Sequence, residues 1–517
     1  MRSERAAGVL LHPTSLPGGF GIGELGEEAR RFVDFLAAAG QSLWQILPLG
    51  PTGYGDSPYA CFSAFAGNPL LLDLRRLADE GDIAHGELDA APPFPDDTVD
   101  YGAVIGFKSR LLRQAAARFR KGADAERRSA FERFCAENDA WLDAYALFRA
   151  LKDEHGGAVW NTWDWPLASR EPKALAAARE RLADAVFEQR YVQWQFFRQW
   201  ADVKRYANER GIQIVGDAPI FAAYDSADVW QHPELFFLDE RLSPTVVAGV
   251  PPDYFSKTGQ LWGNPLYRWQ AMEGDGFAWW VARIEQALKT VDVLRLDHFR
   301  GFAAYWEVPA GETTAVRGRW VNGPGAKLFE ALEDALGELP LIAEDLGLIT
   351  PDVHKLRKQL QLPGMIVLQF AFATDATNTY LPHNLAANCV AYTGTHDNET
   401  TAGWYASRGA DEKAYLHRYL GPADEPVHWQ LIRAAYRTVA DVAICPLQDV
   451  LGLGNEARMN APGRLGGNWA WRFGADALHP DIAARLLDLA YTYGRKELPE
   501  EEKQEEEEPL RYEPEEP

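Results

Sequence analysis

Eight short apolar segments, each leading into polar or Gly/Pro-containing residues, dominate the pattern of this sequence. In chain order they span residues 8–15, 43–53, 212–219, 291–299, 339–347, 364–372, 388–398 and 441–449. Helical patterns separate most of them, as at 27–40 and 326–337. Near-continuous apolar strands that alternate with amphipathic helices are typical of a parallel sheet covered by helices. Eight such units favour an α/β fold of the (β/α)₈ TIM-barrel type, with an open doubly wound sheet as the alternative.

The spacing of these segments predicts two insertions in the barrel. A mainly helical insertion at about 55–205 separates the second and third segments, and a smaller one is expected at about 218–285. We therefore expect a catalytic barrel over 1–494, with one helix at 480–493 and no C-terminal β-sandwich. Residues 495–517 are acidic and interrupted by proline, which predicts a disordered tail.

Charge and cysteine content exclude several classes of protein. The formal net charge of −23 argues against nucleic acid or an anionic membrane as the partner. No segment approaches the roughly 20 apolar residues of a membrane span, and the amino-terminal apolar run is too short for a signal peptide. The four cysteines have no close spacing, which fits a reducing compartment and neither a disulfide framework nor a zinc site. We expect a cytoplasmic protein, and the sequence specifies no oligomeric state.

Acidic residues close three of the apolar segments. Asp297 ends the fourth, Glu344 the fifth, and Asp397 follows the seventh beside His396. Each carboxylate alone is also explained as a cap of the next helix. In a barrel, however, the carboxyl ends of the strands converge on one mouth, so the three carboxylates are expected to share a site.

Paired carboxylates at one mouth suit the chemistry of a glycosidic bond. An ionised carboxylate attacks the anomeric carbon, and a protonated partner donates to the leaving oxygen. Arg295 lies two residues before Asp297, on the same face of the strand, and can keep that carboxylate ionised. Glu344 has no basic residue within several positions, which is compatible with a raised pKa.

Several segments resemble those of known enzymes. RLDHFRG (295–301), AEDLG (343–347) and GTHDNET (394–400) resemble motifs of the α-retaining glucan-active barrel enzymes. Four longer segments narrow the resemblance to 4-α-glucanotransferases of the amylomaltase, or disproportionating-enzyme, type. They span residues 8–26, 55–74, 216–230 and 249–269. The similarity extends from about residue 8 to about residue 494.

The resemblance implies roles for individual residues around the donor sugar. Asp297 corresponds to the nucleophile, Glu344 to the acid/base, and Asp397 to a carboxylate that stabilises the transition state. Arg295, His396 and Asp217 correspond to residues around the donor sugar. Phe221 and Ala222 stand where amylases usually have Asn-His, which places the chain with amylomaltases.

The resemblance also implies aromatic contacts to glucan. The segment 251–265 is predicted to be a Gly/Pro-containing loop that overhangs the cleft. The implied glucan contacts are Tyr54, Tyr59, Tyr254, Phe255 and Trp262, with Tyr101 in a remote groove. Ordinary packing is the alternative for Tyr101. His12 and His298 also follow apolar segments, but a lone strand-end histidine is more often structural, and neither receives a catalytic role here.

The implied activity is retaining transfer of an α-1,4-glucan segment through a covalent glycosyl-enzyme. The acceptor is the 4-OH of glucose, a maltooligosaccharide or another glucan, so the expected partners are α-1,4-glucans and maltooligosaccharides. No cofactor is expected, and residues 397–399 lack the spacing of a calcium loop. Two alternatives stay open: a retaining α-glucan hydrolase of the amylase kind, and an inactive glucan-binding protein. The presence of all three carboxylates argues against the second.

Overall fold

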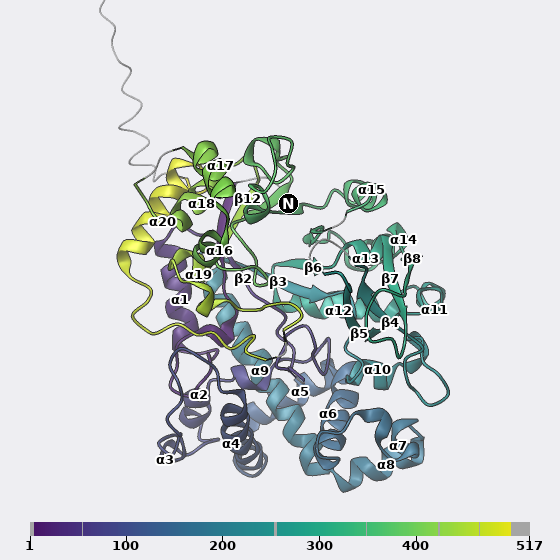
Figure 1. Ribbon diagram of the computed structural model, residues 1–517. Coiled ribbons are helices and arrows are strands. Elements are labelled where there is room, and N and C mark those ends of the chain that lie inside the picture. Colours follow the sequence, from purple (N-terminus) through teal and green to yellow (C-terminus); the bar gives the residue numbers. More distant parts are fainter. Residues whose placement is uncertain are drawn as a thin grey trace, which may run out of the picture.

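Eight parallel strands curve around the centre of the protein, as seen in the computed structural model, which describes residues 5–497 apart from 54, 253–255, 348, 422–423 and 465 (Figure 1). The neighbour order is β10-β11-β12-β1-β2-β3-β6-β9. The strands are β1 (Ala6–Leu10), β2 (Leu43–Gln45), β3 (Gln213–Pro219), β6 (Val293–Asp297), β9 (Leu341–Ala343), β10 (Gly364–Val367), β11 (Cys389–Tyr392) and β12 (Val442–Pro446). Each lies within or overlaps one of the eight predicted segments.

The sheet curls into a barrel. The backbone N–H of Ala343, at the end of β9, donates to the carbonyl of Pro363 just before β10, at 2.9 Å. That bond brings the two ends of the strand order together. The predicted (β/α)₈ barrel is therefore confirmed, and the open doubly wound sheet is excluded.

Apolar side chains fill the barrel from alternate positions of its strands. Val215, Val293, Ile342, Met365 and Val390 belong to one buried cluster inside the ring. Their neighbours along the strands, such as Leu294 and Leu296, are buried in the larger core that includes the surrounding helices. Both faces of each strand are covered, which is why the segments are apolar almost throughout instead of alternating.

Helices surround the barrel. They are α1 (Glu27–Ala38), α9 (Ala183–Asn208), α12 (Ala278–Thr290), α13 (Arg300–Ala303), α14 (Ala326–Leu336), α15 (Pro351–Gln359), α16 (Thr401–Ser407), α17 (Ala410–Leu420), α18 (Val427–Tyr436), α19 (Leu447–Val450) and α20 (Pro480–Thr492). The helices expected at 27–40, 326–337 and 480–493 are confirmed as α1, α14 and α20.

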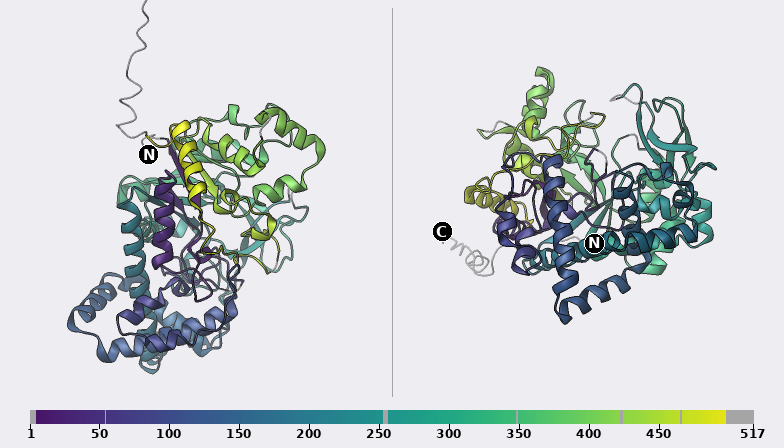
Figure 2. Two further views of the ribbon diagram at one scale, coloured as in Figure 1. Left: turned by 90° about the vertical axis from the view of Figure 1, so that its left-hand side faces the viewer. Right: turned by 90° about the horizontal axis from the view of Figure 1, so that it is seen from below.

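A group of helices between β2 and β3 in the sequence lies below the barrel in Figure 1 and in the left view of Figure 2. It comprises α2 (Leu74–Asp79), α3 (His85–Leu88), α4 (Tyr101–Gly122), α5 (Ala125–Glu137), α6 (Asp139–Glu154), α7 (Trp165–Ala168), α8 (Pro172–Arg181) and the start of α9. Further along α9, Trp200 contacts Trp44 of β2 at a ring distance of 6.4 Å. One helix thus serves both regions, and the division into a barrel with insertions stays a proposal.

A second sheet was not predicted. It has four antiparallel strands in the order β5-β4-β7-β8. They are β4 (Val246–Val250), β5 (Gln260–Pro265), β7 (Ala304–Pro309) and β8 (Arg319–Asn322), with α10 (Ala227–Gln231) and α11 (Trp269–Gly274) nearby in the chain. The prediction that 251–265 is entirely loop is wrong, because its last residues form β5. Four of the six residues of β5 are exposed, so its sequence lacks the apolar alternation that marks a strand.

The folded part of the protein extends past residue 495, where the disordered tail was predicted to begin. Arg495 is 2% exposed and donates to backbone carbonyls of Ala6 and Tyr436, from β1 and α18. It therefore belongs to the folded protein, whereas residues 498–517 lie outside the described part. Between Leu447 and Glu497 the described residues form helices and loops with no β-sandwich. No helix in the described ranges is long and apolar enough to span a membrane.

Candidate active site

An arginine on β6 holds two carboxylates from neighbouring strands. β3 and β6 pair so that Asp217 lies opposite Arg295, and Pro219 lies opposite Asp297. Arg295 donates from Nη1 to Asp217 Oδ2 at 2.6 Å and from Nη2 to Asp297 Oδ1 at 3.0 Å. The Asp217 side chain is fully buried, whereas that of Asp297 is 28% exposed. Asp297 is thus the more exposed of the two carboxylates, and the predicted pairing with Arg295 is present.

Tyr59 completes the surroundings of Asp217. Its hydroxyl donates to Asp217 Oδ2 at 2.6 Å, and its ring stacks on His396 at 5.1 Å. Burial raises the pKa of Asp217, and the charge of Arg295 opposes that shift. Burial, with the Asp217 charge, also raises the pKa of Tyr59, so this hydroxyl is a hydrogen-bond donor at neutral pH. The structure therefore brings together Tyr59, Asp217, Arg295 and His396, four of the predicted sugar-binding residues.

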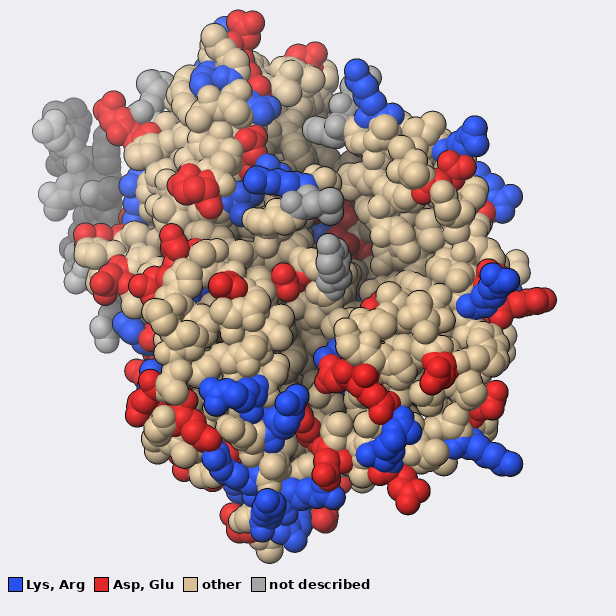
Figure 3. Space-filling model, turned by 60° about the horizontal axis from the view of Figure 1, so that its bottom comes forward, with Lys and Arg blue, Asp and Glu red and all other residues tan. Residues whose placement is uncertain are grey.

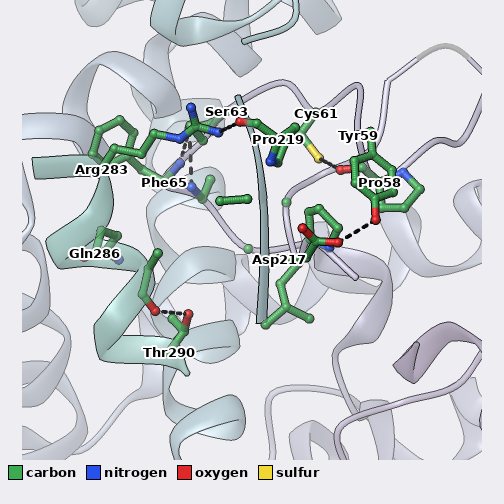
Figure 4. A pocket seen from close by; sticks show the side chains of 18 of the residues that line it. Pro58, Tyr59, Cys61, Ser63, Phe65, Asp217, Pro219, Arg283, Gln286 and Thr290 are labelled. Carbon is green, nitrogen blue, oxygen red and sulfur yellow. Dashed lines mark hydrogen bonds between the residues drawn. The ribbon is translucent and has the colours of Figure 1, made fainter. Parts of the chain in front are cut away.

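Asp217 is one of the residues that line a cavity of about 100 Å³ (Figure 4). Its lining includes Asp217, Asp228, Arg283 and Cys61, from β3 and the segments packed around it. Arg283 reaches across this region and donates to the carbonyl of Pro219, at the end of β3. The end of β3, the strand that carries Asp217, is therefore also held by a residue of α12.

Glu344 follows β9 and faces the same mouth. Its Oε2 accepts the backbone N–H of His298 at 2.7 Å, and its Oε1 accepts that of Leu346 at 2.9 Å. Desolvation by the surrounding protein raises the pKa of Glu344; the charge of Arg295 opposes this shift and that of Asp297 adds to it. The raised pKa inferred from the local sequence agrees with this direction. A carboxyl group of this kind can hold a proton at a pH where an exposed glutamate cannot.

Asp397 lies in the loop after β11 and is held differently. Its side chain is 46% exposed, and the nearest cationic candidate is His396, whose Nε2 lies 3.4 Å from Oδ2. Burial lowers the pKa of His396, which favours its neutral form. Asn460 donates from Nδ2 to Asp397 Oδ1 at 2.6 Å, and Arg458 donates from Nη2 to the backbone carbonyl of Asp397, also at 2.6 Å. Hydrogen bonds from the loop after β12 hold this carboxylate.

Sequence reasoning missed Arg458, Asn460 and Trp469. The Trp469 ring lies 5.7 Å from that of Tyr59 and 6.0 Å from that of His396. These residues belong to a polar, glycine-containing loop in which apolar residues do not recur at the spacing of a helix or a strand. One signal could have found them: the loop after the eighth strand of a barrel must pass the mouth, so its polar and aromatic residues are site candidates.

The aromatic residues predicted to contact glucan are only partly within the described structure. Trp262 on β5 is 38% exposed and meets the His298 ring edge-on at 4.7 Å, beside the end of β6. Tyr54, Tyr254 and Phe255 lie outside the described residues. Tyr101 begins α4, is partly buried, and donates from its hydroxyl to the carbonyl of Trp469 at 2.9 Å. It is not within the group around Asp297.

The arrangement favours acid–base and nucleophilic chemistry by carboxylates. Figure 3 shows a hollow in one face of the molecule with acidic side chains in its depth. In the described ranges no group of three or more His, Cys, Asp and Glu side chains is arranged to hold a metal ion. An arginine-paired Asp297 and a protonatable Glu344 at one barrel mouth match the two roles that cleavage of a glycosidic bond requires.

Comparison with known proteins agrees with this chemistry. The family model described as 4-alpha-glucanotransferase matches residues 11–476. The 4-alpha-glucanotransferase of Thermus thermophilus is 54% identical over 498 residues, covering 95% of this chain and 99% of the relative. That of Synechocystis is 52% identical, covering 96% and 99%. The amylomaltase of Streptococcus agalactiae, solved with acarbose, superposes with a TM-score of 0.93 at 40% identity, covering 95% of this chain and all of that one. The chain therefore belongs to the 4-alpha-glucanotransferase family of retaining glycosyl-transferring enzymes, as the resemblance of its motifs predicted.

Proposed function

We propose that Asp297, Glu344 and Asp397 carry out the transfer between α-1,4-glucans and maltooligosaccharides. The observation that supports this assignment most strongly is the arrangement on β6 and β9. Arg295 binds Asp297 while leaving it partly exposed, and Glu344, just after the next strand of the sheet, lies in an environment that raises its pKa. One carboxylate is thereby suited to attack and the other to donate a proton.

In the first step, an oxygen of Asp297 attacks the anomeric carbon of the donor sugar. The bond from that carbon to the leaving glucan oxygen breaks, and Glu344 transfers its proton to that oxygen. The product is a glycosyl ester on Asp297 and a shortened glucan with a free 4-OH. Charge that develops on the sugar ring is stabilised by Asp397, whose carboxylate is positioned by Asn460.

In the second step, the 4-OH of an acceptor sugar gives its proton to the Glu344 carboxylate. Its oxygen attacks the anomeric carbon, and the bond to Asp297 breaks, which restores both carboxyl groups. Two inversions give retention of the α configuration. Transfer competes with hydrolysis when acceptor contacts favour a sugar over water. The partly exposed Trp262, next to His298 at the end of β6, is proposed as one such contact.

The remaining predicted contacts are part of the same proposal. Tyr59, Asp217, Arg295 and His396 surround the donor sugar, an assignment supported by their mutual contacts. Tyr54, Tyr254 and Phe255 are proposed as glucan contacts from the resemblance alone. Tyr101 is proposed to border a remote glucan groove, a role supported by the partial exposure of its ring.

The product distribution from maltotriose tests the proposed transfer. We expect free glucose together with a ladder of oligomers longer than the substrate, separated by chromatography. An amylase-like hydrolase would instead raise the reducing-end count without forming longer products. A fluorinated maltosyl fluoride that forms the ester quickly and releases it slowly should label one residue. Mass spectrometry of the peptides should locate the label on Asp297, and a label elsewhere would overturn the nucleophile assignment.

A further inference from the structure

The residue after Asp297 has an unusual backbone conformation. His298 has φ = 54°, in the left-handed region, although it is neither glycine nor asparagine. A side chain with a Cβ rarely adopts this conformation unless the surrounding structure requires it. The chain must change direction here, because β6 ends at Asp297 and α13 begins at Arg300.

The backbone N–H of this residue has a defined partner. It donates to Glu344 Oε2 at 2.7 Å, while the other carboxyl oxygen accepts the N–H of Leu346. The peptide group that follows Asp297 therefore binds Glu344 directly. No intervening side chain is needed to set the position of one carboxyl group relative to the other.

Backbone hydrogen bonds on both sides connect β6 and β9. Glu344 donates its N–H to the Leu296 carbonyl at 3.1 Å, and Phe299 donates to the Glu344 carbonyl at 3.0 Å. His298 accepts from the N–H of Gly301 at 2.9 Å, which closes the turn into α13. The left-handed residue lies in the middle of this set, so another backbone conformation would move its N–H away from Glu344.

The imidazole ring is held on two sides. Trp262 meets it edge-on at 4.7 Å, and a Cβ added to Gly301 would lie only 3.2 Å from His298 Cδ2. Burial lowers the pKa of His298, so the ring is neutral and adds no charge beside Glu344. The titratable and charged groups that act on Glu344 are Arg295 and Asp297 of β6 and Tyr380, after β10. The contribution of His298 is therefore its backbone N–H.

We propose that His298 is a positioning residue, whose left-handed backbone presents its N–H to Glu344 and sets the acid/base group against the nucleophile. The inference rests on the proposed roles of Asp297 and Glu344. It gives a reason for the strained residue that follows the nucleophile. It also separates a backbone role from any contact that the imidazole makes with glucan.

Substitutions that all remove the imidazole but differ in backbone preference test the proposal. Glycine adopts φ > 0 without strain, alanine resists it, and valine resists it most. We expect H298G to retain the alkaline limb of the kcat profile with maltotriose within about 0.2 pH unit of the parent. In H298V, the Glu344 carboxylate loses an N–H that stabilises its charged form, so its pKa should rise. The alkaline limb of the kcat profile should then move to higher pH by about half a pH unit or more. The kcat of H298V should be at least about tenfold below that of H298G.

Two further variants keep the test decisive. H298N, whose residue type tolerates the left-handed region, should behave like H298G. If H298V does not fold, as judged by circular dichroism and thermal unfolding, H298A and H298G provide the same comparison with a difference of one methyl group. Equal kcat values and equal pH profiles for H298G and for the alanine and valine variants would overturn the proposal.

A separate measurement distinguishes failure of this inference from failure of the proposed function. α-Maltosyl fluoride loses fluoride without needing a proton, so E344Q should still release a burst of fluoride, measured before the steady state, while losing turnover of maltotriose. If E344Q loses the fluoride burst as fully as it loses turnover of maltotriose, the acid assignment fails. If E344Q behaves as expected and the His298 variants do not differ, only the positioning role fails.

Discussion

The two sides of the mouth hold their carboxylates in different ways. On the β3–β6 side, Asp217 and Asp297 are bound by one buried arginine, and the contacts arise from the register of adjacent strands. On the β11 side, Asp397 is nearly half exposed and is held by Asn460 from a loop. Removing one member of an ion pair that is buried within a sheet costs much free energy, because the other member is left buried and unpaired. Removing the hydrogen-bond partner of a carboxylate that is in contact with water costs less free energy, because water replaces the lost partner.

The largest effect is expected from removal of the proposed nucleophile on the sheet side. In D297A no glycosyl ester can form, so turnover of maltotriose should fall at least about 10⁴-fold. Binding of maltoheptaose, measured by calorimetry with the folded variant, should be largely retained. Turnover within about tenfold of the parent enzyme would contradict the assignment.

Loss of the arginine should affect both stability and activity. R295M leaves the Asp217 carboxyl buried without its cation, which should lower the free energy of unfolding by about 3 kcal/mol and kcat/KM by about 10³-fold. Urea unfolding and maltotriose kinetics measure the two effects. The matched control is R433M, which breaks the Arg433–Glu425 ion pair nearer the surface and should cost less than about 1 kcal/mol. Equal losses of the free energy of unfolding in R295M and R433M would show that burial of the ion pair does not determine its contribution to stability.

The pH dependence should identify the proton donor on the sheet side. Because the pKa of Glu344 is raised, its carboxyl group should remain protonated at pH values well above the ordinary glutamate pKa of about 4.3. Activity should then fall about tenfold per pH unit as the pH rises through that pKa. Fluoride release from α-maltosyl fluoride, measured before the steady state, should lack this alkaline limb because its leaving group needs no proton. The same limb for both donors would point to another ionising group, such as Asp217.

A smaller effect is expected on the loop side. N460A removes the amide that binds Asp397 Oδ1, but water can reach this carboxylate, so kcat/KM should fall only about tenfold, equivalent to about 1.4 kcal/mol. Steady-state kinetics with maltotriose measure this. N468A is the control in the same loop, since Asn468 bonds to backbone groups of Ala461 and Arg464. A fall in kcat/KM as large as that expected for R295M would contradict the proposed difference between the two sides of the mouth.

The smallest effect is expected away from both sides. Y101F removes one hydrogen bond to the Trp469 carbonyl and should cost about 1 kcal/mol of stability, with maltotriose kinetics unchanged. If the ring borders a remote groove, Y101A should also lower the rate on long amylose chains relative to maltotriose. Equal rate changes on both substrates would assign Tyr101 to packing.

The barrel and half of the mouth could be predicted because their signals are local. A strand buried on both faces must be mainly apolar, and most residues of the eight barrel strands are apolar. Arg295 and Asp297 are two residues apart on one strand, so their shared face follows from the period of a strand. The second sheet could not be predicted in this way, because β5 is mostly exposed and because β4 pairs on its other edge with β7, which lies far along the chain.

The sequence by itself determined the number of barrel strands, the end of the barrel that carries charge, and which three carboxylates are proposed to act there. These properties depend on the order of residue types along short segments, which burial and strand geometry dictate directly. Only the tertiary structure decided what holds each carboxylate. Asn460 is 63 residues from Asp397, and the His298 N–H is 46 residues from Glu344. Contacts of that kind depend on how loops pass across the mouth, and no local pattern encodes that path.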